Sequence, residues 1–233
     1  MNINQDAKGF LASLQLADSA LPIGRFAYSY GLESFFSANS LIKDDAITKI
    51  ISSLLLNSIG PLDGVSVALS HKAEDENNLD ELIKLDHMVT VRKTTPSSRQ
   101  ASQTCGRQLA SLAISLLDGQ CKTDYLLKVT RGESEGNIGV VMGSIASNFN
   151  IGRTEAVLIE LRDSAASLFS AAVRLDRISA LKAQVALKSC EPIIIVACET
   201  ALNTSAESMY STAPQMEIYS MLHNYADIRM FRG

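Results

Sequence analysis

Apolar residues recur at helical spacing along most of this chain, and this periodicity constrains its fold more than any other feature. The clearest repeat has apolar residues at i, i+3, i+4, i+7 and i+8: Ile47, Ile50, Ile51, Leu54 and Leu55. Asp44 and Asp45 precede this repeat and Gly60-Pro61 follows it. Acidic residues favour a helix N-terminus and Pro stops a helix, so the pattern predicts an amphipathic helix that ends before Gly60.

Similar patterns predict helices along the rest of the chain. The predicted ranges are 79–88, Ser97 or Ser98 to Gly119, 140–148, 154–175 and 179–202, with a glycine-rich loop over 132–139. Pro192 is expected to kink or break the last of these helices. The run Ile193-Ile194-Ile195-Val196 has strand propensity, but both of its flanks are helical in pattern, so we predict a buried helix there.

Composition supports packed helices rather than strands. Hydrophobic residues make up 46 %, aromatic residues only 6 %, and there is no Trp. The 233 residues are enough to bury one sizeable core, and no composition shift marks a domain boundary. We therefore predict an all-α, single-domain bundle of about ten helices over residues 1–233, with residues 1–9 disordered when the chain is alone.

Charge and hydropathy exclude several classes of protein. The formal net charge is −4 and no basic block occurs, which argues against a nucleic-acid-binding protein. The longest uninterrupted apolar run, 192–198, is far shorter than the about 20 residues that a transmembrane helix needs, so no membrane partner is expected. Residues 1–5 lack the pattern of a secretory signal, so we expect a cytoplasmic protein.

The cysteines and histidines do not have metal-ligand spacing. We expect four scattered cysteines to be small buried hydrophobic residues: Cys105, Cys121, Cys190 and Cys198. The histidines are His71, His87 and His223, and none belongs to an HxH, HxxxH or HExxH motif. We expect His71 to form a surface pair with Glu74, and we predict no metal site and no cofactor. The chain also has no phosphate-binding GxxxxGK[ST] or GxGxxG motif.

One segment matches a catalytic motif. Residues 132–136 read Gly-Glu-Ser-Glu-Gly, which fits the GxSxG elbow that presents a serine nucleophile. Asp163 or Asp176 and then His223 follow in the order of a hydrolase triad. However, no alternating strand and helix pattern precedes Ser134, and two flanking glutamates oppose a developing oxyanion. A glycine-rich solvated turn is the favoured interpretation, and no catalytic residue is predicted.

Four basic residues precede and enter the predicted helix that begins at Ser97 or Ser98: Arg92, Lys93, Arg99 and Arg107. They form either a hydrated helix face or a polar docking surface for carboxylates.

The two ends of the chain contain recognition-type residues. Residues 20–33 are apolar, rich in aromatic residues and interrupted by Pro and Gly, without a nucleophile–base pair. Near the other end, Arg229 and Arg232 alternate with Ile228, Met230 and Phe231. Two interpretations of this tail remain open: a frayed, hydrated end, or a tail anchored by its apolar residues that presents its guanidinium groups.

These segments resemble a known family. Residues 14–33 are similar to the UreF pattern LQLADSALPIGxFxYSxGLE, and Arg99, Ser102 and Gly106 fall on its Arg-x-x-Ser-x-x-x-Gly helix. Two later segments are similar to the family patterns NLVSAAVRLxPLGQxxGQ and SMRHExxxxRLFRS: Leu168 and 170–175 with Gln184, and Ser220-Met221, His223 and 229–232. Ser167 and Asn224 stand where the family has Asn and Glu.

The resemblance implies an all-helical, non-enzymatic, homodimeric scaffold in urease maturation. Such a protein bridges the UreD (UreH) accessory protein and the UreG GTPase in a complex that delivers Ni²⁺ to apo-urease. The residues that match the terminal signatures are implied in partner binding: Phe26, Tyr28, Ser29, Gly31, Glu33, His223, Arg229 and Arg232. On this basis Arg229→Ala is expected to weaken GTPase binding by about 1–3 kcal/mol.

Two alternative functions remain beside the scaffold. One is a metallochaperone that binds nickel itself through His and Cys side chains. The other is an activator that supplies Arg229 or Arg232 to the GTPase as a catalytic arginine.

Overall fold

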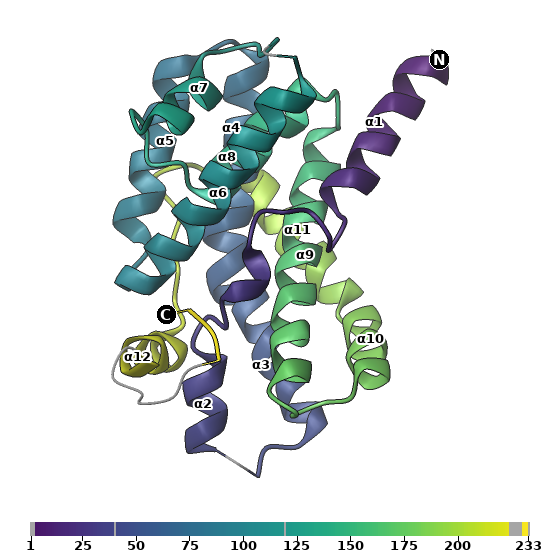
Figure 1. Cartoon of the computed structure of the whole chain (residues 1–233), viewed down its shortest axis with the longest axis vertical. Coiled ribbons are helices and arrows are strands. Elements are labelled where there is room, and N and C mark those ends of the chain that lie inside the picture. The colour runs from purple at the N-terminus through teal and green to yellow at the C-terminus, as the bar shows by residue number, and fades with distance from the viewer. Residues whose placement is uncertain (1–2, 40, 119, 224–229, 233) are drawn as a thin grey trace.

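The computed structural model describes residues 3–39, 41–118, 120–223 and 230–232, with side chains from residue 7 onward. Within this part of the chain every named element is a helix, which confirms the all-α prediction (Figure 1). The first half contains α1 (Ile3–Leu16), η1 (Arg25–Ala27), α2 (Leu32–Ala38), α3 (Asp44–Leu54), η2 (Leu55–Gly64), α4 (Val65–Asp75), α5 (Leu79–Arg92) and α6 (Pro96–Leu116). The second half contains α7 (Tyr125–Arg131), α8 (Ile138–Asn148), α9 (Arg153–Arg174), α10 (Ala180–Ser189), α11 (Glu191–Asn203) and α12 (Pro214–His223).

The core lies around one long helix. α3, η2 and α4 follow one another without a break over Asp44–Asp75, and α8, α9 and α11 pack against them. α5, α6 and α7 cover one end of this arrangement, while α2, α10 and α12 lie at the other (Figure 1). α1 extends from the side of the bundle, and its helix begins at Ile3. Disorder of residues 1–9 in the chain alone stays a prediction.

The closest helix packing is between α4 and α8, because small residues of α8 face α4. A Cβ added at Gly143 would lie 2.0 Å from the Ser70 hydroxyl oxygen and 2.3 Å from the Val67 carbonyl oxygen. A Cβ at Gly139 would lie 2.1 Å from the Ser66 hydroxyl oxygen. No side chain larger than hydrogen fits at either position, so these two glycines set the distance between the two helices.

The predicted helix stop at Gly60-Pro61 is wrong. The chain instead widens into the π-helical segment η2 and continues through Pro61 into α4. Pro has no N–H to donate and its ring clashes in a regular α-helix, whereas wider π-type turns relieve this conflict. Gly60 also faces α11 closely, since a Cβ there would lie 3.1 Å from the Ala197 Cβ.

Most of the other predicted helices are confirmed. α5 ends before Pro96, and α6 begins at that proline, with the Thr95 hydroxyl oxygen accepting a hydrogen bond from the Ser98 amide at 3.1 Å. The cap is thus Thr95 rather than Ser97 or Ser98. The predicted break near Pro192 occurs at Cys190, which separates α10 from α11. The run 193–196 is helical, as predicted.

The helix Asp44–Asp75 is long and apolar enough to cross a membrane, judged by length and composition alone. This long apolar stretch does not appear as an uninterrupted run in the sequence. Of its apolar window, 56 % is buried inside the protein. Central helices of globular proteins pass the same test, so the finding is weak support for a membrane span.

Candidate functional site

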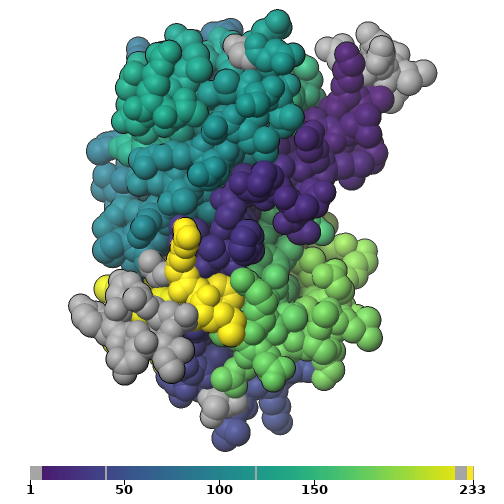
Figure 2. All heavy atoms as spheres, viewed as in Figure 1, coloured from purple at the N-terminus to yellow at the C-terminus, as the bar shows by residue number. Residues whose placement is uncertain are grey.

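The described end of the chain lies between its N-terminal segment and α9. Figure 2 shows these tail atoms, coloured yellow, between the purple N-terminal region and the green of α9. The Arg232 amide donates a hydrogen bond to the Ala27 carbonyl at 2.8 Å, and Arg232 forms an isolated parallel β-bridge with Tyr28. Residues 230–232 are therefore attached to the N-terminal segment by backbone pairing.

Glu33 holds the tail through its carboxylate. Its Oε1 accepts the Met230 amide at 2.6 Å, and its Oε2 accepts the Phe231 amide at 3.1 Å. Glu33 lies in the first turn of α2, where the helix dipole favours a negative charge. A charged acceptor strengthens both hydrogen bonds, so one side chain orders two consecutive tail residues.

Gly31 allows the chain to turn into α2. Its φ of 87° lies in the left-handed region that glycine adopts without strain. A Cβ at this position would lie 2.6 Å from the Met216 carbonyl oxygen of α12. Gly31 therefore lets α12 pack against the start of α2, which places His223 close to Glu33.

His223 completes the attachment from α12. Its Nε2 donates to the Phe231 carbonyl at 3.2 Å, because a carbonyl can only accept. In the neutral ring Nδ1 is then an acceptor, and the Ser34 hydroxyl lies 3.4 Å from it. Glu33 Oε2 is 3.7 Å from the same nitrogen. The imidazole is 2 % exposed, so it acts inside the protein rather than at its surface.

Arg174, at the end of α9, contacts both chain ends. Its guanidinium carbon lies 4.1 Å from the centre of the Phe231 ring, and its Nη2 donates to the Phe26 carbonyl. Phe231 is buried, whereas Arg174 is largely exposed. Partial burial lowers the pKa of Arg174 from its ordinary value, and the group still stays charged near neutral pH. We use the name tail clasp for Glu33, Arg174 and His223 together with residues 230–232.

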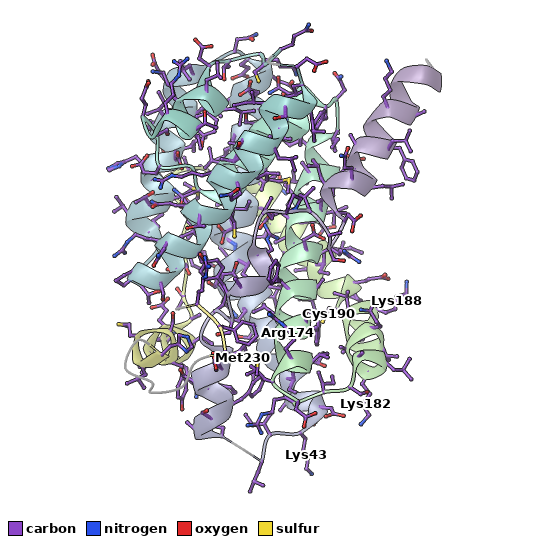
Figure 3. The ribbon with its side chains drawn as sticks, in the orientation of Figure 1. Lys43, Arg174, Lys182, Lys188, Cys190 and Met230 are labelled. Atoms are coloured by element: carbon purple, nitrogen blue, oxygen red, sulfur yellow. The ribbon has the colours of Figure 1, made fainter. Side chains whose placement is uncertain are left out.

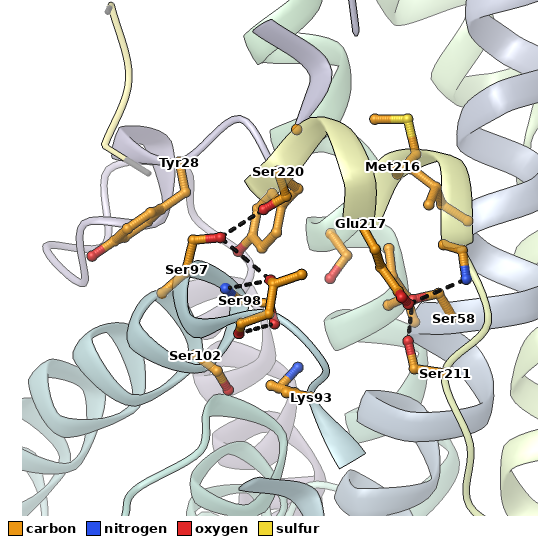
Figure 4. Close-up of a pocket in the computed structure, with 18 of the residues that line it drawn as sticks. Tyr28, Ser58, Lys93, Ser97, Ser98, Ser102, Ser211, Met216, Glu217 and Ser220 are labelled. Carbon is orange, nitrogen blue, oxygen red and sulfur yellow. Dashed lines mark hydrogen bonds between the residues drawn. The ribbon is translucent and has the colours of Figure 1, made fainter. Parts of the chain in front are cut away.

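A cavity of about 120 Å³ lies beside the tail clasp, between α12, α6 and η2 (Figure 4). Hydroxyl groups on its walls bond to one another. Ser97 Oγ lies 2.6 Å from Ser220 Oγ, and Ser58 Oγ lies 2.8 Å from Ser211 Oγ. These pairs join α12 and the segment before it to α6 and η2.

Two ion pairs with little solvent exposure reinforce the same region. Lys93 Nζ lies 2.8 Å from Asp63 Oδ1, and Arg25 Nη2 lies 2.7 Å from Glu160 Oε2. Burial by itself would lower the pKa of Arg25, but the adjacent Glu160 carboxylate raises it above its ordinary value. Arg25 thus remains charged and links the N-terminal segment to α9.

The structure divides the sequence-predicted site residues into two groups. Phe26 is 63 % exposed, and Arg232 is also exposed. The buried or nearly buried group joins the chain ends to each other or to the core: Tyr28, Ser29, Gly31, Glu33 and His223. Direct partner contact by this second group stays a prediction. Arg229, together with the change to Ala proposed for it, lies outside the described residues.

Ser134 is buried and bonded to Asp86, whereas the favoured interpretation of the sequence placed it in a solvated turn. It is 6 % exposed, and its hydroxyl donates to Asp86 Oδ2 at 2.7 Å. The same carboxylate accepts the amides of Gly136 at 2.7 Å and Asn137 at 2.8 Å. Asp86 on α5 therefore organises the loop 132–137, and Ser134 is one of its donors. Among the described hydrogen bonds, neither Ser134 nor His223 reaches the other.

The His71 prediction is also wrong. His71 is buried and donates from Nε2 to the Ile151 carbonyl at 2.7 Å, while Nδ1 lies 3.7 Å from Asp75. Glu74 is fully buried and instead accepts the Thr123 amide and hydroxyl, both at 2.9 Å. Both residues fasten loops to α4 rather than pair with each other at the surface.

The cysteines largely follow the prediction. Three of them, Cys105, Cys190 and Cys198, are buried and Cys121 is half-buried, and all four are free thiols. Burial raises the pKa of Cys105 to about 11, so this thiol stays protonated near neutral pH. The described residues contain no group of three or more His, Cys, Asp or Glu side chains that could hold a metal ion.

The basic region is mostly structural. Arg92 donates from Nε to the Met209 carbonyl at 3.0 Å, Lys93 pairs with Asp63, and Arg99 donates to the Lys93 carbonyl at 2.5 Å. Both interpretations of the sequence, a hydrated helix face and a docking surface, left these side chains without partners inside the chain. The structure instead shows all three bonded within it. Only the remaining member of the set, Arg107, is exposed and without a described hydrogen bond.

Arg174 is the residue of the tail clasp that reasoning from the sequence did not single out. The available signal was its place within the segment 170–175, which matches the family pattern. Nothing in that segment by itself indicates contact with Phe26 or Phe231, because both lie far away along the chain.

Comparison with known proteins agrees with the resemblance. The family model described as UreF matches residues 43–191. A protein named urease accessory protein UreF 2 from Brucella canis is 29 % identical over 223 residues, which cover 96 % of this chain and 91 % of that protein. Urease accessory proteins UreF from Bacillus sp. (strain TB-90) and Yersinia pestis are 24 % and 26 % identical, covering 95 % and 97 % of this chain and 97 % and 99 % of theirs. The similarity to these relatives therefore extends beyond residues 43–191 toward both chain ends.

Proposed function

This chain belongs to the UreF family of urease accessory proteins, and from this we propose that it is a non-catalytic scaffold in urease maturation. The scaffold joins a UreD-type accessory protein to a UreG-type GTPase while nickel is inserted into apo-urease. It works in the cytoplasm, as a homodimer. Nickel is the cargo of this complex, and the chain itself needs no cofactor.

The tail clasp is the observation that carries this proposal. It brings the two ends of the chain, which hold the recognition-type residues, onto one surface. Exposed Phe26, Met230 and Arg232 lie on that surface, and aromatic, Met and Arg side chains are enriched at protein interfaces. A scaffold needs such a surface and needs no reaction centre.

Size-exclusion chromatography with light scattering tests the proposal. The full chain is run alone and then with its cognate UreD-type and UreG-type proteins, with GTP and nickel present. For the chain alone we expect a species with twice the 25.1 kDa mass of one chain. For the mixture we expect a larger, stable complex. A variant that ends at residue 229 keeps α12 and removes the described tail, and we expect it to lose part of this complex.

A full-length chain that elutes unchanged in the presence of both partners would contradict the scaffold proposal. If the truncated variant assembles as well as the full chain, the scaffold stands but its interface lies away from the tail.

Exposed Arg232 also favours a second candidate, an activator that supplies an arginine to the GTPase. Docking and catalysis predict different results for Arg232→Ala. Removal of a docking arginine lowers the affinity for the GTPase. Removal of a catalytic arginine lowers the rate of GTP hydrolysis in the saturated complex by about 10³-fold or more. Single-turnover hydrolysis at saturating scaffold separates the two.

The metallochaperone alternative needs the chain itself to bind nickel. Titration calorimetry of the isolated full chain with Ni²⁺ tests it directly. Stoichiometric binding would support that alternative, and binding only at non-physiological concentrations would remove it.

A further inference from the structure

A segment without helical structure connects α11 to α12, and we refer to residues 204–213 as the strap. Figure 3 shows that it runs from the region of α5 and α6 to α12, away from α10 with its labelled Lys182 and Lys188. The strap contributes Ser211 and Ala213 to the wall of the hydroxyl-lined cavity.

The backbone of the strap pairs with η2. The Thr212 amide donates to the Asn57 carbonyl at 2.8 Å, and the Tyr210 amide donates to the Pro61 carbonyl at 3.3 Å. Residue numbers rise along the strap while they fall along η2, so the two segments run antiparallel. Amides on one side of an extended chain recur about every 6.7 Å, which is comparable to the about 5.4 Å pitch of an α-helix. An extended segment can therefore bond to two successive turns.

Pro61 makes carbonyls of η2 available to the strap. Pro has no N–H, so the turn before it has one carbonyl more than the helix has amides to bond it. In a regular α-helix each carbonyl is used by the amide four residues later. The strap thus meets the helix at the place where its own series of hydrogen bonds is interrupted.

The other contacts of the strap are few. Ser211 Oγ lies 2.8 Å from Ser58 Oγ of η2, and Arg92 of α5 donates from Nε to the Met209 carbonyl at 3.0 Å. Within the strap only Ala206 and Met209 are buried. Segments with so few buried apolar contacts open locally at a lower free energy than the core.

The helices at both ends of the strap are held independently of it. Ser220 Oγ of α12 lies 2.6 Å from Ser97 Oγ of α6, and the Tyr219 hydroxyl accepts Asn39 Nδ2 at 3.2 Å. α11 packs against η2 and α9. The strap can therefore leave η2 while α11 and α12 keep their places.

We propose that the strap is a gate of the cavity and that η2 is its latch. The strap opens as one unit, and the amides of Tyr210 and Thr212 then bond to water instead of to helix carbonyls. The wall formed by Ser211 and Ala213 moves away, so solvent and small polar solutes enter the cavity from this side. α4, α8 and α9 stay folded throughout. This opening is separate from the scaffold function and does not depend on it.

Native-state hydrogen exchange of the full chain at low urea concentrations tests the opening. Rates are corrected for intrinsic exchange. We expect the Tyr210 and Thr212 amides to exchange together, at least about tenfold faster than the amides of Val141 in α8 and Leu168 in α9, and with little dependence on urea. Equal rates and equal urea dependence at all four amides would overturn the proposal, because the strap would then open only in global unfolding.

Two changes test the latch. Ser211→Ala removes the hydroxyl pair with Ser58. Pro61→Ala supplies an amide that competes with the strap for the carbonyls of η2. Each change is expected to speed exchange at Tyr210 and Thr212 at least about threefold, which corresponds to the loss of one hydrogen bond.

Each change has a matched control. Ser115→Ala alters an exposed serine of α6, and Pro192→Ala alters an exposed proline at the start of α11. Neither control should change exchange in the strap, and circular dichroism confirms that all four variants keep their helices. Exchange no faster in Ser211→Ala and Pro61→Ala than in the controls would overturn the role of η2 as a latch.

A thiol placed in the cavity tests whether the opening reaches it. Ala101 lines the cavity and is 2 % exposed, whereas Ala113 on the same helix is 1 % exposed and lies outside the cavity wall. Iodoacetamide labelling with peptide mass spectrometry distinguishes the introduced thiol from the native cysteines. We expect faster labelling of Ala101→Cys than of Ala113→Cys, and a further increase at the first site alone when Ser211→Ala is added. Equal labelling at both sites would overturn the gate.

Discussion

Glu33 shows how one side chain decides whether a chain end is ordered. Its two oxygens accept two consecutive tail amides, and its position in the first turn of α2 favours its negative charge. The recognition motif in the sequence includes this residue, but its role in the structure is to organise the tail from within. Under the scaffold proposal, Glu33 acts on a partner through the tail residues that it holds rather than by direct contact.

Glu33→Gln tests this role, because Gln has nearly the same shape and lacks the charge. We expect the tail to loosen by about 2 kcal/mol or more, because one end of Gln is an NH2 group that cannot accept a tail amide and the other end is a neutral rather than a charged acceptor. Native-state hydrogen exchange at the Met230 and Phe231 amides measures this directly. Glu81→Gln, at a surface pair with Lys84, is the control, and equal exchange in both variants would contradict the role.

From the buried thiol of Cys105 we predict a loss of folding stability at alkaline pH. Burial raises the pKa of its thiol to about 11 in the folded chain, against 9.0 for an unperturbed thiol. Above pH 9 the unfolded chain therefore loses this proton while the folded chain keeps it. Folding stability falls as the pH rises from 9 to 11, by up to about 1.4 kcal/mol per unit. Urea unfolding of the unchanged protein and of Cys105→Ala should diverge over this range, and parallel curves would refute the effect.

Helix α8 lies close to α4 because the glycines between the two helices carry no side chain. Its glycines let α4 approach so closely that a methyl group cannot be inserted between the two helices. In isolation the same positions would favour alanine, which is the better helix former. Packing between the two helices therefore outweighs helix propensity along this contact.

Gly143→Ala is expected to destabilise the protein by about 2 kcal/mol or more. The gain in helix propensity is about 1 kcal/mol, and overpacking against Ser70 and Val67 outweighs it. Ser111→Ala, on the exposed face of α6, is a control in which propensity acts alone. The midpoint of urea unfolding should fall for the first variant and stay or rise for the second.

The elements that the sequence predicts well are those with a long amphipathic stripe. α9 follows its apolar pattern over 22 residues, and α5, α6, α10 and α11 follow theirs. Continuation through Pro61 was not predictable, because π-type turns leave no mark in a 3.6-residue period. The short helices α2 and α7, of seven residues each, are set by tertiary packing rather than by periodicity.

The candidate site was predictable only in part, for a related reason. The sequence marks both chain ends as unusual, and the exposed residues Phe26 and Arg232 fit that prediction. It does not show that the ends meet, since backbone pairing between Ala27 and Arg232 depends on the whole fold between them. Arg174 acquires its role only after α9 has placed it beside both ends.

For the molecule as a whole, a buried ion pair ties the N-terminal segment to the centre of the bundle. Arg25 and Glu160 are 11 % and 2 % exposed, and their closest atoms lie 2.7 Å apart. Loss of one partner leaves the other charge buried without compensation. This ion pair is one of the contacts that fasten the N-terminal segment, and with it the tail clasp, to α9.

Removal of either charge should therefore destabilise the protein strongly. We expect Arg25→Met and Glu160→Leu each to lower the free energy of unfolding by about 3–5 kcal/mol. The double variant Arg25→Met with Glu160→Leu should recover much of the loss, because no buried charge remains. Lys49→Ala, in an exposed pair with Asp45, is the control and should not change the unfolding curve measurably. Additive losses in the double variant would show that the two side chains do not interact.

The tail clasp can form only at the end of synthesis of the described chain. The hydrogen bond from Met230 to Glu33 joins residues that are 197 positions apart in the chain. During synthesis α2 and α9 are made long before residues 230–232 leave the ribosome. A nascent or prematurely terminated chain can thus form much of the helical core but not the tail clasp, so only a chain whose synthesis has passed residue 232 completes the clasp.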